Sequence, residues 1–587
     1  MHSEPRLPQQ SRMFIVLVAL AQGGLMYVAQ KGQELGWPLL GALGGRVCWY
    51  TLVLTVPTMM TLSVVHLGDR RFWQHVAATS GLFLALAAGA AWTATGAPGL
   101  SASAVLAPFG ASVALCAFVL LPWLQCRLEH GHWRAPYPAL FEHAWQNTLT
   151  LALAALFTGI CWLVLHLWAG LFSLVRIDFF RDLFREDAFA MLATGAMAGL
   201  GILIGRTRQR AIQVARQILF AIFRGLLPLL AFIALLFMAS LPFTGLQPLW
   251  ETRSAAALLV SVIALLVLFL NAVYQDGGDP PPYPAWLRRL VQAALAVLPL
   301  YAALALVAIG LRVHQYGWTA DRVWAGLLTL LASAYALGYA WSALRGGTWL
   351  RPLPRVNQAL SWLVIGIAIL ANTPLLDPHR IAVASQVKRF EQGLTSATDL
   401  DLAYLRFESG RRGYRAALAL REHPAFIDSR VDRDTLEEVL SRNRRWGREP
   451  TTADTRRDEA GLRAHIQVAE GSQSPDDVWW HALAGGDRCQ RPSPCVVLTP
   501  DLDADGQSEI LLCEVNWPGG GQCLLYARTA DGEWPAVAQT PLWHGTADTR
   551  IDLIERLRAG EVSSVQQPWP DLRIGDGPTL RLDPLEH

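Results

Sequence analysis

The residues best suited to chemistry lie in a short acidic loop near the carboxyl terminus, Thr499–Cys513 (TPDLDADGQSEILLC). The pattern D-x-D-x-D-G places carboxylates at the first, third and fifth positions of a calcium loop, and its glycine permits a sharp turn. Leu512 occupies the twelfth position, where an EF-hand has a bidentate glutamate. The sequence predicts either a calcium loop or a hairpin turn in which Asp side chains bind backbone amides. The calcium ligands would be Asp501, Asp503, Asp505, Gln507 through its carbonyl, and Glu509.

Four cysteines flank this loop: Cys489, Cys495, Cys513 and Cys523. Four cysteines allow three pairings. The local pairing, Cys489 with Cys495 and Cys513 with Cys523, is the simplest, because the second bond would join two predicted strands across a Gly-rich turn. A zinc site is the alternative, although the sequence has neither CxxC spacing nor a nearby His pair. Disulfides would indicate an oxidising compartment.

The elements that must position this loop follow a very apolar part of the chain. The protein has 587 residues, of which 52% are hydrophobic and 16% are charged. Residues 13–372 contain repeated stretches of about 20 apolar residues, which is the length a helix needs to cross a bilayer. Residues 373–587 have an ordinary globular composition. The formal charge of +2 gives no indication of a nucleic-acid partner.

The sequence predicts a polytopic α-helical membrane bundle followed by an α+β soluble domain. We expect a transmembrane domain at 1–373, a helical juxtamembrane part of the soluble domain at 374–447, and a small, mostly β periplasmic domain with an antiparallel sheet at 459–587. About eleven membrane helices are expected, near 13–29, 47–65, 74–94, 104–124, 147–171, 188–205, 225–245, 254–274, 290–311, 321–343 and 356–373.

Basic residues in the loops between these helices predict the orientation. With a cytoplasmic amino terminus, the inner segments hold sixteen arginines and the outer loops hold eight basic residues. Positive residues favour the cytoplasmic side. Eleven crossings then place the carboxyl-terminal domain outside, in the periplasm of a Gram-negative cell, which agrees with the cysteine pattern.

The segment Leu311–Leu327 (LRVHQYGWTADRVWAGL) resembles the bacterial membrane-protein family of domain of unknown function (DUF) 4153. The signature R-x-x-x-Y-G-W/L-T-x-x-R is matched by Arg312, Tyr316, Gly317, Thr319 and Arg322. The segments NAVYQDG and DPHRIAVASQVKRFEQG also look familial, and the resemblance covers roughly residues 150–420. It implies an inner-membrane protein with a multi-helix core, and it implies no reaction.

The signature itself suits a short turn at the outer face. Gly317 permits a tight backbone turn, and Thr319 is placed to cap the next helix. Arg312 and Arg322 would flank this turn. They would either clamp two helices through Asp321 or the backbone, or contact an anion or lipid headgroup.

Three classes of function fit the sequence. The first is a non-catalytic scaffold, assembly or sensing protein with a periplasmic partner-binding domain, and it is favoured because no catalytic motif is found and no catalytic residue is assigned. The second is a transporter or lipid-handling protein, which needs a polar cavity. The third is a polytopic glycosyltransferase-like enzyme, which needs an acidic residue in the first outer loop, where the sequence offers Glu34. The expected partners are the lipid bilayer and a periplasmic protein or lipid.

Overall fold

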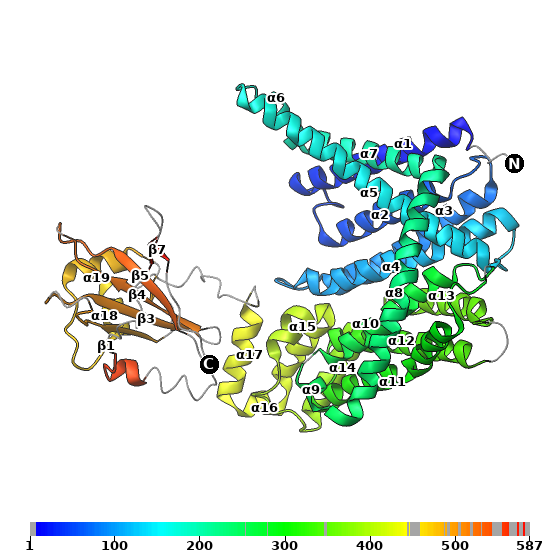
Figure 1. Ribbon diagram of the computed structural model, residues 1–587. Helices are drawn as coiled ribbons and strands as arrows, with labels where there is room; N and C mark the ends of the chain where they lie inside the picture. Colours follow the sequence, from blue (N-terminus) through cyan, green and yellow to red (C-terminus); the bar gives the residue numbers. More distant parts are fainter. Residues whose placement is uncertain are drawn as a thin grey trace. The chain divides into compact units, whose positions relative to one another are not determined.

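The structure is a computed structural model that describes residues 7–252, 254–278, 280–345, 349–442, 445, 458–486, 488–489, 494–502, 506–516, 520–529, 531–542, 555–562, 572–573 and 579–580. The chain forms two compact units, Met1–Glu449 and Pro450–His587. Figure 1 shows a helical first unit and a second unit built around a sheet.

The first unit is a bundle of long helices. Its long helices are α1 (Gln9–Glu34), α2 (Leu43–Ser63), α3 (Arg70–Ala94), α4 (Ala102–His130), α5 (Tyr137–Leu174), α7 (Asp187–Thr207), α8 (Gln209–Thr244), α10 (Ala255–Tyr274), α11 (Ala285–Tyr316), α12 (Ala320–Leu344) and α13 (Leu353–Leu370). Two short helices, α6 (Phe179–Arg185) and α9 (Gln247–Glu251), lie in loops. Within the described part of the chain, all the long helices except α2 are long and apolar enough to cross a membrane, which makes ten.

Helix α2 nevertheless runs from one end of the bundle to the other. At its start, Gly44 lies beside Ala91 and Thr95 at the end of α3. Just beyond its end, the carbonyl of Val65 accepts a 2.7 Å hydrogen bond from Ser11 Oγ at the start of α1. Its 21 residues rise about 30 Å. Ten of the eleven expected crossings are therefore candidate membrane spans, and a crossing by α2 stays a prediction.

Glycines allow α7 to approach its neighbours closely. A Cβ on Gly195 would clash with the carbonyl of Ala19 in α1, and one on Gly199 would lie 2.7 Å from the Ala19 side chain. On another face of α7, a Cβ on Gly201 would lie 2.6 Å from the backbone of Ala154 in α5. Small residues spaced four apart are typical of close helix packing in membranes.

The bundle has two apolar cores. One lies among α1 to α5 and α7, the other lies among α8 and α10 to α12, and α13 contributes to both. A polar cluster joins the halves. Asn357 Nδ2 of α13 donates to Asn271 Oδ1 of α10 at 2.7 Å and to the Tyr137 hydroxyl of α5 at 2.9 Å. The hydroxyl of Tyr339 in α12 accepts from Asn271 Nδ2 and donates to Asn357 Oδ1, both at 2.7 Å.

Short helices follow the last long helix and pack against one another around a third core. They are α14 (Pro378–Glu391), the π-helix η1 (Tyr404–Glu408), α15 (Gly410–Ala419), the 3-10 helix η2 (Leu420–Glu422), α16 (Pro424–Asp428) and α17 (Arg430–Ser441). They belong to the same compact unit as the bundle. The start of α1 and α15 lie at opposite ends of this unit (Figure 1).

The second unit contains a five-stranded sheet in the order β1-β2-β3-β4-β5. Its strands are β1 (Ile466–Val468), β2 (Cys495–Leu498), β3 (Ile510–Asn516), β4 (Gly520–Tyr526) and β5 (Ala536–Leu542). The helices α18 (Glu459–His465) and α19 (Asp477–Ala484) precede β2, and β6 (Leu572–Arg573) pairs with β7 (Thr579–Leu580). The expectation of an antiparallel sheet is wrong in one respect. β1 pairs parallel to β2, so the sheet is mixed, because α19 provides the crossover between them.

Candidate functional site

A cavity of ≈ 380 Å³, which we call the junction cavity, lies where the long helices meet the short helices that follow them. Two indole rings line it: Trp92 lies near the end of α3, and Trp324 lies in the first turns of α12. Asn372 follows α13, and its Nδ2 donates a 2.7 Å hydrogen bond to Ser112 Oγ of α4. The start of α14 and Arg412 of α15 complete the lining. The lining thus comes from α3, α4, α12, residues 371–379 and α15, and its mainly apolar wall carries a few polar groups.

The start of α14 places its charged groups through a local sequence signal. Pro378 is the first helical residue, where a missing N–H costs nothing. Asp377 is the N-cap, and its Oδ1 accepts from the amides of His379 at 2.9 Å and Arg380 at 3.3 Å. Its Oδ2 accepts a 3.0 Å hydrogen bond from Arg412 Nε. The Asp377 carboxylate thus has three donors, two from its own helix and one from α15.

His379 is the most unusual group in the cavity. Its residue is 4% exposed, and its Nδ1 is buried without a hydrogen-bond partner among the described residues. Burial lowers the pKa of His379, and Arg412 lowers it further, whereas Asp377 and Asp321 act in the opposite direction. The balance of these effects favours the neutral form of the imidazole. An unsatisfied buried polar atom costs about 1–3 kcal/mol, so folding alone does not account for this nitrogen.

Three arginines of α15 gather on Trp92. The guanidinium carbons of Arg411, Arg412 and Arg415 lie 4.9, 4.7 and 5.8 Å from the centroid of the indole ring. Arg411 also donates to the carbonyl and the hydroxyl of Thr95 at 2.8 and 3.0 Å. Cation–π contacts of this kind hold cations beside an aromatic face. They fix α15 to the end of α3 and concentrate positive charge beside the cavity.

The family-signature turn lies between α11 and α12, close to this junction. Gly317 has φ +75°, a backbone conformation that favours glycine. The Thr319 hydroxyl accepts from the amide of Arg322 at 3.4 Å, so the predicted N-cap is confirmed. Arg322 Nη1 donates to the carbonyl of Gly317 at 2.7 Å, and its guanidinium lies over the Tyr316 ring at 5.4 Å. Arg312 is close enough to act on the charge of Arg322.

Side chains of α14 and η1 form hydrogen bonds with the backbone of this turn. Arg389 donates to the carbonyls of residues 314 and 315 at 3.1 and 2.9 Å, and Gln386 Nε2 donates to the carbonyls of residues 316 and 318 at 3.2 and 2.8 Å. Ser385 Oγ accepts from the amide of residue 318 at 3.1 Å. The amide of Ala320 donates to the Tyr404 hydroxyl at 2.7 Å. We call this set of six hydrogen bonds the turn clamp.

The predicted calcium loop is described in part. Asp503 and Asp505 lie outside the described residues. Asp501 Oδ2 accepts from the amide of Gly506 at 3.1 Å, and Glu509 Oε2 accepts from the amide of Leu502 at 2.7 Å. These bonds are those of a turn in which carboxylates bind backbone amides. The fourth predicted ligand, Gln507, lies among the described residues. Within the described part of the chain, no group of three or more His, Cys, Asp or Glu side chains could hold a metal ion.

The four cysteines beside this loop come together in the two local pairs. Cys489 bonds to Cys495, and Cys513 bonds to Cys523, which lies directly opposite it in the β3–β4 register. The pairs belong to different apolar clusters of the second unit. Because β2 alternates its side chains between these clusters, the two bonds support opposite faces of the sheet.

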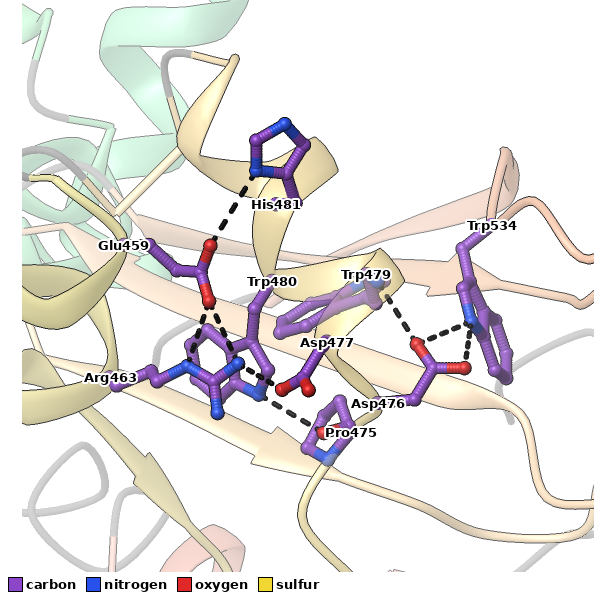
Figure 2. A network of polar contacts seen from close by, with 9 residues as sticks. All are labelled: Glu459, Arg463, Pro475, Asp476, Asp477, Trp479, Trp480, His481 and Trp534. Carbon is purple, nitrogen blue, oxygen red and sulfur yellow. Dashed lines mark hydrogen bonds and ion pairs between the residues drawn. The ribbon is translucent and has the colours of Figure 1, made fainter.

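Figure 2 shows a polar network around α19 in the same unit. Asp476 caps this helix by accepting from the amide of Trp479 at 3.0 Å, and it also accepts from Trp534 Nε1 at 3.0 and 3.1 Å. Arg463 pairs with Glu459 at 2.8 Å and lies 5.3 Å from the Trp480 ring. The ring of Trp480 is buried, and its Nε1 donates to the carbonyl of Pro475 at 3.1 Å. This network joins α18, α19 and the segment before β5, and its contacts are structural.

The long apolar helices define the chain as a multi-pass membrane protein. The family model described as "Domain of unknown function (DUF4153)" matches residues 58–421, more than half of the chain, and the chain belongs to this family. The resemblance inferred from the YGWT signature is confirmed. The family match begins at residue 58, earlier than the predicted start near residue 150. No curated protein and no solved structure matches the chain. The junction cavity and the turn clamp lie within the matched residues, whereas the acidic loop and the paired cysteines lie beyond them.

Sequence reasoning missed the junction cavity. Its lining residues come from five segments of the chain, and none of these segments forms a known motif. One signal was present: the Asp-Pro-His run at Asp377 is an N-cap signature. The arginine-rich segment of α15 follows only after α14 and η1. That signal predicts a helix start, but it does not reveal that Trp92 and Trp324 close over it.

Proposed function

We propose that the protein is a non-catalytic scaffold or sensing protein of the bacterial inner membrane, and that its carboxyl-terminal unit binds a partner in the periplasm. The turn clamp is the observation that carries this proposal. It fixes α14 and η1 on the loop between two long helices through six hydrogen bonds. A joint of this kind lets the position of membrane helices set the position of the helices that follow them, which is what a scaffold or a sensor requires.

Three features support the proposed orientation. The loops expected inside hold twice as many basic residues as those expected outside. The start of α1 and the short helices lie at opposite ends of the first unit (Figure 1), as an odd number of crossings requires. The paired cysteines of the second unit suit an oxidising compartment.

Photo-crosslinking in living cells tests partner binding. A photoreactive amino acid would replace Val478 of α19 or Val537 of β5, whose residues are 50% and 55% exposed. A matched control would carry it at Leu394, an exposed residue of the first unit. We expect a discrete protein adduct from the second unit, and none from Leu394. Identical adducts from all three positions, or none from any position, would contradict the scaffold proposal.

A second candidate is a lipid-handling or transport protein, and a specific cavity favours it. A space of ≈ 710 Å³ lies between the two halves of the bundle, lined by residues of α4, α5, α10, α12 and α13. Its lining is mostly apolar, with Tyr137, Asn271 and Asn357 of the polar cluster at one part of the wall. This chemistry suits an acyl chain beside a polar group. Native mass spectrometry of the full-length protein, comparing wild type with Ala264→Trp in the wall, tests whether retained lipid occupies this space.

The glycosyltransferase-like alternative receives less support. Its expected acidic residue, Glu34, is exposed at the end of α1 and pairs with Lys31 at 2.7 Å. Calcium binding by the acidic loop stays a prediction and would serve to stabilise the second unit.

A further inference from the structure

The junction cavity contains a side chain whose hydrogen-bonding capacity the protein leaves unused. His379 lines the cavity, and its Nδ1 is buried without a partner among the described residues. A buried polar atom is normally paired. Asp377 caps the helix start that carries His379, and the His379 side chain is buried at 4% exposure. A ligand atom in the cavity would supply the missing partner.

Arg412 offers a second unused group. Its Nε is bonded to Asp377, and its two terminal nitrogens have no hydrogen bond to any residue that the structure describes. The planar guanidinium is suited to binding two oxygens of one oxyanion. The Asp377 carboxylate is already engaged by two amides and by Arg412 Nε. It therefore orients the guanidinium and does not compete strongly for a further donor.

The charges around the cavity favour an anion. Four arginines gather here, since Arg380 lies at the start of α14 while Arg411, Arg412 and Arg415 share the Trp92 face. The carboxylates that act on His379 are Asp377 and Asp321. Of these charged groups only Arg412 and Asp377 line the cavity, and the excess of positive charge comes from the three other arginines beside it. A fixed cationic cluster with apolar walls raises the local concentration of anions.

The size and the walls narrow the ligand class. A cavity of ≈ 380 Å³ is larger than a free oxyanion needs, and Trp92, Trp324 and Phe109 provide apolar surface. The ligand would therefore carry an organic group as well as the anion. We propose that the junction cavity binds the phosphate of an organic phosphate ester, with Arg412 and His379 contacting its oxygens. The ester comes either from a soluble phosphate or from a lipid headgroup, and the proposal does not depend on the scaffold role.

Thermal unfolding of the purified full-length protein in a non-ionic detergent, with sn-glycerol 3-phosphate titrated at constant ionic strength, tests the proposal. We expect a saturable rise in Tm for the wild-type protein. Arg412→Gln and His379→Phe should each weaken the apparent affinity at least tenfold. Phe keeps a ring of similar shape but removes the unpaired nitrogen. His379→Phe should therefore unfold at the same or a higher temperature than wild type without ligand, so lost binding will not reflect a lost fold.

Arg430→Gln is the matched control, because Arg430 is 93% exposed on α17 and its loss changes the net charge equally. It should bind as wild type does. The proposal is overturned if His379→Phe binds as wild type, if it is less stable without ligand, or if Arg430→Gln weakens binding as much as Arg412→Gln.

Native mass spectrometry of the delipidated protein with phosphatidylglycerol or diacylglycerol distinguishes the sources. Retention of phosphatidylglycerol that is lost in His379→Phe identifies a lipid headgroup, whereas a saturable response to glycerol phosphate alone identifies a soluble ester. If wild type responds to neither phosphate compound, the phosphate class is contradicted.

Discussion

The backbone amide of Ala320 donates a 2.7 Å hydrogen bond to the hydroxyl of Tyr404. Ala320 is the first residue of α12, and Tyr404 begins η1, beyond the last of the long helices. The first amides of a helix have no intrahelical partner, and here a side chain from a distant segment supplies one. The connection between the bundle and the short helices therefore uses a group that the helix itself leaves free.

Tyr404→Phe should lower the stability of the protein by about 1–2 kcal/mol, because the Ala320 amide loses its acceptor in a partly buried position. Thermal unfolding of the full-length protein in detergent measures this change. Tyr414→Phe is the control, since the Tyr414 ring contacts the Arg406 guanidinium at 4.7 Å and a Phe ring preserves that contact. Equal stability of Tyr404→Phe and the control would contradict the role of the hydroxyl.

Gly317→Ala should break the turn clamp. Its φ of +75° disfavours a side chain, and a Cβ would lie 2.6 Å from Arg389 Cδ. We expect a loss of about 1–3 kcal/mol and faster proteolysis within α14. Gly310→Ala, in α11, is the matched control, because a Cβ there meets nothing within 4 Å and Ala favours a helix. A Gly317→Ala protein as stable as Gly310→Ala would show that the turn tolerates a side chain.

The sequence predicts the parts of this structure that depend on local signals. Apolar segments predict the long helices, and the position of Thr319 predicts that its side chain caps the helix that follows. The spacing of Cys513 and Cys523 around a Gly-rich turn predicts that the two cysteines can form a disulfide. It does not predict β1, because three residues at Ile466 carry too little alternation to indicate a strand. The junction cavity depends on long-range packing, which one sequence does not reveal.

The stability of the protein should depend on pH through His379. Burial lowers the pKa of His379 in the folded state, so the unfolded chain binds a proton first as the pH falls below about 6.5. The contribution of this group is present above that pH and is lost below it, at up to about 1.4 kcal/mol per pH unit. Between pH 7.5 and 5.5 in phosphate-free buffer, the Tm of wild type should fall more than that of His379→Phe. Parallel curves would contradict a neutral buried imidazole.

Calcium should stabilise the second unit if the acidic loop binds it. Extracellular loops bind calcium with dissociation constants of about 0.1–1 mM, so about 10 mM calcium should add about 1–3 kcal/mol relative to EDTA. The double variant Asp501→Asn with Asp503→Asn should lose this gain, whereas Asp531→Asn, in an exposed turn of the same unit, should retain it. If calcium does not change the Tm of the wild-type protein, calcium binding is contradicted and the hairpin turn is the correct interpretation.

The central claim is that the carboxyl-terminal unit faces the periplasm, and a fusion between the two units tests it most directly. Alkaline phosphatase, which folds to an active enzyme only in an oxidising compartment, would follow residue 449, with green fluorescent protein at the same position as the complementary reporter. The account predicts an active phosphatase and a dark fluorescent protein. An inactive phosphatase with a fluorescent partner would place the unit in the cytoplasm and contradict both the eleven-crossing topology and the proposed periplasmic partner.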